Sequence, residues 1–70
     1  MEFKLTGEYI ELIKLLKKLQ IAESGGHAKM MVEEGLVNVN GEIEYRKRAK
    51  LRNGDKILVD GQSITIVGMS

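Results

Sequence analysis

Residues 24–41, SGGHAKMMVEEGLVNVNG, switch from a helical to an alternating pattern of apolar residues. In the first half, Ser24 is placed to cap a helix, and Gly35 is suited to the left-handed conformation that ends one. The apolar stripe between them consists of Ala28, Met31 and Val32. In the second half, the alternating residues end at Asn40-Gly41, a strong signal for a two-residue hairpin turn. This stretch therefore predicts a helix, a strand and a tight turn in succession.

The segment before this stretch predicts a first helix. From Glu8 to Leu19, apolar residues recur at helical spacing and form one buried stripe that begins at Tyr9. Thr6 is placed to cap this helix, and Glu8 lies near the positive end of its dipole. Only a few residues separate the two helices, so they are expected to pack as neighbours.

The segment after it predicts several short strands. Asn53-Gly54 and Asp60-Gly61 are further turn signals between alternating segments. Residues 2–5, EFKL, are suited to a short strand at a sheet edge. Together these patterns predict an α+β fold, in which two packed N-terminal helices precede a small antiparallel sheet of about four to five strands.

Length and composition exclude several classes of function. The 70 residues suffice for a single domain, residues 1–70, with a thin core and little room for a deep pocket. The absence of cysteine excludes disulfides, thiolate nucleophiles and cysteine-based metal sites. No catalytic set of side chains stands out, and a lone histidine makes no metal site, so we expect neither an enzyme nor a cofactor. With no membrane-length apolar run and no signal pattern, the sequence predicts a cytoplasmic protein.

Positive charge is concentrated near one segment of the chain. Residues 46–56 hold six basic side chains and one acidic side chain, so their formal charge is +5, whereas the whole chain sums to +1. Segregated charge creates a directional field that attracts anions. We call residues 46–52, RKRAKLR, the basic run and interpret it as an anion-binding surface, because arginine binds phosphate through its planar fork. Its candidate ligands are Arg46, Lys47, Arg48, Lys50 and Arg52.

With these motifs in register, the chain resembles the S-four-type RNA-binding domain, named after a small-subunit ribosomal protein. The resemblance covers about residues 10–59. The matching positions in the helix and hairpin are Ser24, Ala28, Lys29, Gly35, Val37, Val39, Asn40 and Gly41. Those in the closing turn and strand are Gly54, Asp55 and Ile57. The chain is also as short as the free-standing bacterial proteins made of this domain alone.

The resemblance implies an αL-type fold that docks on structured RNA, with ribosomal and transfer RNA as candidates. The implied RNA-binding residues are Ser24, His27 and Lys29 at the start of the second helix, together with the basic run. Near a helix start, His27 is expected to be neutral, and two roles stay open for it: a hydrogen bond donated to phosphate or a plain surface position. Gly25 stands where the family usually has a basic residue, so we expect the phosphate contacts to shift toward the hairpin. We expect a monomer that does not bind membranes and is linked to the ribosome or to RNA metabolism.

Other interpretations stay open at this point. The basic run can instead contact an acidic partner, which would make the chain a protein-interaction module. The strands and turns also resemble a β-grasp sulfur carrier, but such a carrier needs a terminal Gly-Gly, and this chain ends Gly68-Met69-Ser70. With three aromatic residues in the chain, a platform that stacks bases is not expected. Tyr45 can stack on one base from its place just before the basic run, but it is expected to be half-buried in the sheet.

Overall fold

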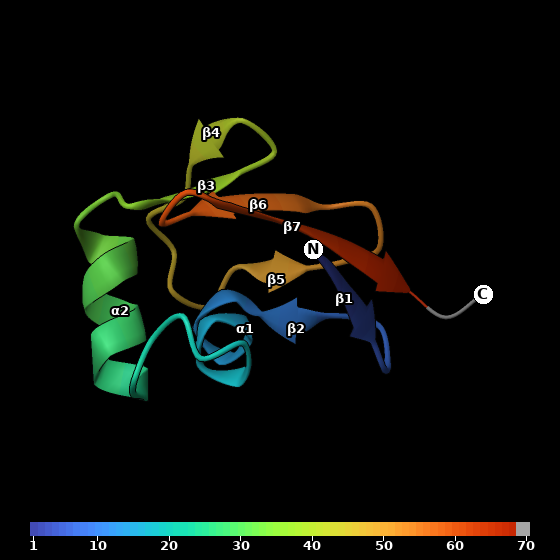
Figure 1. Cartoon of the computed structure of the whole chain (residues 1–70), viewed down its shortest axis with the longest axis horizontal. Coiled ribbons are helices and arrows are strands. Elements are labelled where there is room, and N and C mark those ends of the chain that lie inside the picture. The colour runs from blue at the N-terminus through green and yellow to red at the C-terminus, as the bar shows by residue number, and fades with distance from the viewer. Residues whose placement is uncertain (69–70) are drawn as a thin grey trace.

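Two helices pack against one face of a five-stranded sheet, and a two-stranded ribbon lies beside them (Figure 1). The computed structural model describes residues 1–68. Met69 and Ser70, on which the sulfur-carrier alternative depends, lie outside the described part. In chain order the elements are β1 (Glu2–Leu5), β2 (Ile10–Glu11), α1 (Leu12–Lys18), α2 (Gly25–Glu33), β3 (Val37–Val39), β4 (Glu42–Ile43), β5 (Lys50–Leu51), β6 (Lys56–Val59) and β7 (Gln62–Gly68).

The core lies between the helices and the inner face of the sheet. Side chains alternate across a strand, so every second residue of the central strands points toward the helices. The buried strand residues include Val37, Ile57, Val59, Ile64 and Ile66. They pack in one cluster with the buried helical residues Leu12, Leu15, Leu16, Ala28, Met31 and Val32. The helical stripe predicted for residues 24–35 is therefore confirmed.

The turn and cap signals of the central stretch are also confirmed. The Ser24 side chain accepts a hydrogen bond from the N–H of His27 at 3.1 Å and so caps α2. Gly35 follows the helix with φ at +75°, a conformation that favours glycine. A Cβ at this position would also lie only 3.3 Å from the Tyr45 ring, so the close contact favours glycine as well. At the hairpin turn, Asn40 has φ at +53° and Gly41 at +87°, as a type I′ turn requires.

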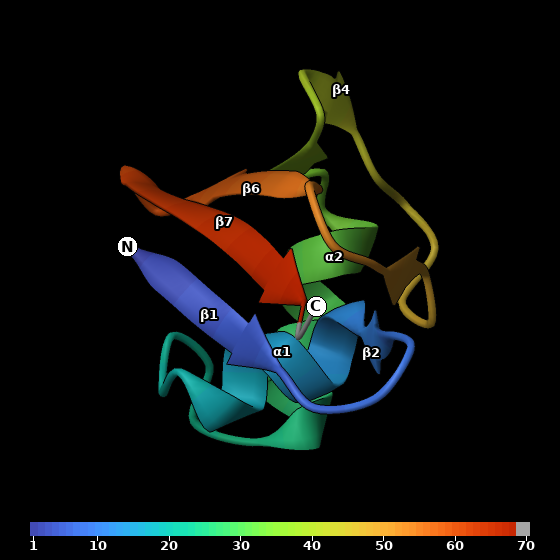
Figure 2. The ribbon, with the colours of Figure 1, turned by 90° about the vertical axis from the view of Figure 1, so that its right-hand side faces the viewer.

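The five-stranded sheet is mixed, so the prediction of an antiparallel sheet was wrong. Its strand order is β1-β7-β6-β3-β4. β1 runs parallel to β7, with Glu2 opposite Thr65, and Figure 2 shows the two strands side by side. The remaining neighbours pair antiparallel. The edge strand at residues 2–5 is confirmed, but its direction was missed because apolar alternation shows which face is buried and not which way a strand runs.

The first helix begins later than predicted. α1 starts at Leu12 rather than Glu8, and its N-cap is Glu11 rather than Thr6. Ile10 and Glu11 form β2, which pairs antiparallel with β5. β1 and β2 therefore precede both helices, and the helices do not stand at the N-terminus of the fold. The prediction failed because the apolar residues near Tyr9 fit both a helical and an alternating pattern.

Candidate nucleic-acid interface

Backbone hydrogen bonds anchor the basic run to the start of α1. The N–H of Leu12 donates to the carbonyl of Ala49 at 2.9 Å, and the N–H of Ile13 donates to the carbonyl of Lys47 at 3.2 Å. The first N–H groups of a helix have no partner within the helix, and no side chain caps α1. Ala49 itself is buried in the core. The loop that carries the basic run is therefore fixed to the helix by its own main chain.

Four of the five predicted ligands in the basic run surround one hollow. This open hollow of about 400 Å³ is lined by Arg46, Arg48, Ala49, Lys50 and Arg52. All four charged residues of this set are exposed, whereas Lys47 is partly buried and does not line the hollow. Cationic side chains gathered around a concave surface reinforce one another's field, so the hollow is suited to an anion.

Arg46 differs from its neighbours because it has an acidic partner. Its Nε and one terminal nitrogen donate to the two oxygens of Glu44 at 3.1 and 3.0 Å, and its backbone N–H also donates to Glu44 at 3.1 Å. The hydrogen bonds from the Arg46 side chain hold the pKa of the Glu44 carboxyl below its ordinary value. The same contact raises the pKa of Arg46. The charge of Arg46 is thus partly compensated, although its side chain stays 80% exposed.

The start of α2 presents a second group of predicted ligands. The Ser24 hydroxyl accepts from the N–H of His27, and His27 Nδ1 accepts from the N–H of Glu23 at 3.0 Å. Because Nδ1 acts as an acceptor, the proton of the neutral imidazole lies on Nε2, which remains a donor. Lys29 is exposed on the same helix. A Cβ at Gly25 would meet Lys17 Cδ at 3.8 Å, an ordinary contact, so this position has space for a side chain.

The two groups of predicted ligands lie toward opposite ends of α2. Ser24 and His27 are at its start, whereas Gly35, after its end, contacts Tyr45 just before the basic run. The helix has nine residues, which corresponds to about 13 Å along its axis. The structure therefore brings four of the five ligands of the basic run together around one hollow, and it places Tyr45, just before the basic run, at the opposite end of α2 from Ser24 and His27.

Tyr9 is a residue of this surface that the sequence reasoning missed. It was assigned to a buried helical stripe, but it precedes β2 and is 41% exposed. Lys50 Nζ lies 4.9 Å and Arg52 Cζ lies 5.8 Å from the centroid of its ring. Both distances fall within the range of cation–π contacts. Its outward position depends on the pairing of β2 with β5, for which the local sequence carries no signal.

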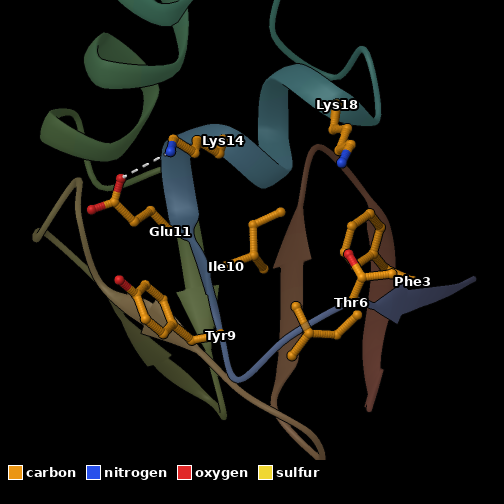
Figure 3. Close-up of a pocket in the computed structure, with 8 residues that line it drawn as sticks. Phe3, Thr6, Tyr9, Ile10, Glu11, Lys14 and Lys18 are labelled. Atoms are coloured by element: carbon orange, nitrogen blue, oxygen red, sulfur yellow. Dashed lines mark ion pairs between the residues drawn. The ribbon is translucent and has the colours of Figure 1, made fainter. Parts of the chain in front are cut away.

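Tyr9 also borders a second hollow, which Figure 3 shows. This hollow of about 350 Å³ is lined by Phe3, Leu5, Thr6, Tyr9, Ile10, Glu11, Lys14 and Lys18. Tyr9 lies at one side of it in Figure 3, and Phe3 and Lys18 lie at the other. Glu11 is paired with Lys14 at 4.0 Å. Tyr9 therefore lies where this hollow meets the cations of the basic run.

Tyr45 also departs from its predicted environment. Its side chain is not half-buried in the sheet, because the residue is 62% exposed. It follows β4 and lies against Gly35. Across residues 1–68, no group of His, Cys, Asp and Glu side chains could hold a metal ion. In the same part of the chain, no helix is long and apolar enough to cross a membrane.

Comparisons with known proteins agree on one family. A family model of the S4 domain matches residues 3–67. The protein YbcJ of Escherichia coli (strain K12) is 41% identical over 59 residues, which cover 84% of this chain and 84% of YbcJ. A protein of Bacillus subtilis (strain 168) named "Probable ribosome maturation protein RlbA" is 39% identical over 54 residues, which cover 77% of this chain and 76% of that one.

A solved structure shares the fold as well as the sequence. The solution structure of YbcJ from Escherichia coli matches with a TM-score of 0.71 and 39% identity, over 94% of this chain and 85% of that chain. It is described as revealing an αL motif involved in RNA-binding. The family model extends over most of the chain, including most of β1, both helices and the strands that follow. The chain therefore belongs to the S4 domain family.

Proposed function

We propose that this protein is an RNA-binding module that docks the basic run on the phosphate backbone of structured RNA. The single observation that carries the proposal is the set of exposed cations, Arg46, Arg48, Lys50 and Arg52, around one hollow on an anchored loop. The relative YbcJ supports it, because the YbcJ structure is described as containing a motif involved in RNA-binding. In this proposal residues 1–70 act as one domain and as a monomer.

The chemistry of the surface favours recognition of backbone and shape. Contacts to phosphate position a protein on RNA but carry no sequence information. Duplex RNA is read mainly by shape, because side chains cannot enter its narrow major groove. We therefore expect contacts from the basic run to depend little on sequence, with Ser24, His27 and Lys29 adding contacts from the first half of α2. The Bacillus subtilis relative, by its name, suggests ribosomal RNA as the first RNA to test.

Binding to a structured RNA hairpin over a salt series tests the proposal. If three to five phosphates are contacted, the logarithm of the association constant should fall with the logarithm of salt with a slope of roughly −2 to −3.5. A variant with Arg46, Lys47 and Arg48 all changed to alanine is expected to bind more weakly and with a shallower slope. Fluorescence anisotropy with a labelled hairpin measures both quantities.

Single substitutions provide a matched control for this experiment. Arg48→Gln and Lys4→Gln remove the same charge, but Lys4 lies on β1, outside the basic run. Arg48→Gln should weaken binding and lower the salt slope, whereas Lys4→Gln should bind like the wild type. Equal losses of RNA affinity in the two variants would show that only the net charge matters and that the basic run is not the binding site. Failure of the wild type to bind at low salt would exclude RNA and leave an acidic protein as the partner to test.

A further inference from the structure

We propose that Tyr9, Lys50 and Arg52 form a site for an unpaired nucleotide of the RNA. The Tyr9 ring stacks on the base, and the two cations contact the phosphates beside it. This inference rests on the proposed function and deepens it by naming the class of RNA. The preferred ligand is then a stem interrupted or flanked by an unpaired nucleotide, rather than a continuous duplex.

The pairing of β2 with β5 places these three side chains on one surface. Ile10 lies opposite Leu51, and Glu11 lies opposite Lys50. Leu51 is buried, and Ile10 packs against the core, so this pair faces inward. Side chains alternate along each strand, and residues directly opposite share a face. The other face of the ribbon, with Lys50 and the Glu11 opposite it, therefore points outward together with Tyr9 and Arg52, and the ring distances place Lys50 and Arg52 at Tyr9.

The Tyr9 ring has the exposure and the surroundings that a nucleobase requires. The residue is 41% exposed and the two cations lie over its ring, so a base that stacks on Tyr9 uses the part of the ring that they leave uncovered or displaces one of them. Every base has a flat π-face, so stacking on an aromatic ring accepts any base. Lys50 and Arg52 lie within 6 Å of the ring centre, close enough to contact the sugar-phosphate backbone of a stacked nucleotide. A guanidinium can also stack on a base.

Tyr9 connects two hollows that provide a path for the strand. Lys50 and Arg52, which lie over its ring, also line the hollow of about 400 Å³ that contains Arg48. Tyr9 itself lines the hollow of about 350 Å³, which contains Lys18 and the ion pair of Lys14 with Glu11. A strand that crosses Tyr9 therefore meets Arg48 in one hollow and Lys18 in the other.

Tyr45 offers a matched comparison within the same chain. It is even more exposed, at 62%, but among residues 1–68 the cation–π contacts involve Tyr9 and not Tyr45. Its ring lies against Gly35 at the end of α2. Exposure alone would assign a base to either tyrosine, whereas the cations beside the ring favour Tyr9. Tyr45 is therefore the control residue for the experiment.

The test compares two RNA hairpins that share a stem, one fully paired and one with a single unpaired uridine. We expect the wild type to bind the second roughly 5- to 150-fold more tightly, the range that one base–aromatic stack provides. Tyr9→Leu should lose this preference and keep its affinity for the paired hairpin. Tyr9→Phe and Tyr45→Leu should both retain the preference. Tyr9 lies outside the core cluster, so Tyr9→Leu is expected to fold, which a thermal melt verifies.

A second readout needs no substitution. In NMR titrations of the wild type with the hairpin that carries the unpaired uridine, the ring-proton signals of Tyr9 should move upfield, and those of Tyr45 should not. Equal affinity for the two hairpins with an unmoved Tyr9 signal overturns this inference and leaves the proposed function standing. A preference that persists in Tyr9→Leu also overturns it, because another group then holds the base. Binding to neither hairpin overturns the proposed function and this inference together.

Discussion

At position 44, a carboxylate limits what its neighbour can contribute to RNA binding. Glu44 holds Arg46 through hydrogen bonds to both carboxylate oxygens. A phosphate that approaches Arg46 must compete with this pairing and is also repelled by Glu44 itself. Bidentate pairing fixes the guanidinium in one geometry, which is the same fork that phosphate requires. Glu44 therefore reduces the affinity of the basic run while it orders one of its members.

Replacing this carboxylate is expected to tighten RNA binding. Glu44→Gln removes the negative charge and frees the Arg46 guanidinium, so the association constant should rise at low salt. The salt slope should become steeper by about 0.7 to 0.9, which corresponds to one additional phosphate contact. Anisotropy titrations at several salt concentrations measure both effects. Glu42→Gln, on β4, removes an acidic charge that has no ion-pair partner among residues 1–68 and serves as the control. Equal gains in the two variants would contradict a specific role for the pair.

At the scale of the elements, the basic run and α1 form one unit. The carbonyls of Lys47 and Ala49 accept hydrogen bonds from the N–H groups of Ile13 and Leu12, respectively. In most helices, such first N–H groups are bonded to water or to a capping side chain. At the start of α2, by contrast, Gly25 and Gly26 are the first helical residues, and the side chain of the preceding Ser24 accepts a hydrogen bond from the N–H of His27 instead of from either glycine. The two helix starts therefore differ in how their main-chain donors are satisfied.

Amide hydrogen exchange should reveal this difference. The amides of Leu12 and Ile13 are expected to exchange slowly, because their hydrogen bonds open only when the basic run leaves α1. The amides of Gly25 and Gly26 should exchange much faster and serve as the internal control. NMR-detected exchange of the free protein measures all four in one experiment. Rapid exchange at Leu12 and Ile13 would mean that the basic run moves independently of the helix.

The elements also show where sequence patterns are sufficient and where they fail. Residues 24–41 were predicted correctly because the cap, stripe, stop and turn each have a local physical cause. β2 was missed because two residues gain a strand conformation only by pairing with β5, about 40 residues away, and short-range patterns contain no such information. The basic run was visible from composition, whereas Tyr9 depended on that same pairing and could not be assigned to the surface.

At the scale of the whole molecule, segregated charge favours binding at the expense of stability. Residues 46–56 combine six basic side chains with one acidic side chain, in a chain whose net charge is +1. Arg48, Lys50 and Arg52 are held around one hollow, so their mutual repulsion is present in the folded state and relaxes in the unfolded chain. A bound polyanion would remove this repulsion. Charge repulsion within the basic run is thus expected to lower the free energy of unfolding of the free protein.

Thermal unfolding of single-charge variants tests this expectation. Arg48→Gln relieves repulsion around the hollow, so its Tm at low salt should lie a few degrees above that of the wild type, because ~1 kcal/mol shifts the Tm of a domain this small by roughly 4–8 °C. At about 0.5 M salt the difference should largely disappear, since the Debye length is then only a few ångströms. Lys4→Gln, on β1, removes the same charge away from the hollow and should show no such gain. A lower Tm for Arg48→Gln at low salt would contradict this expectation. It would mean that Arg48 stabilises the folded protein, and that its charge is not held there at a cost in stability for the sake of a ligand.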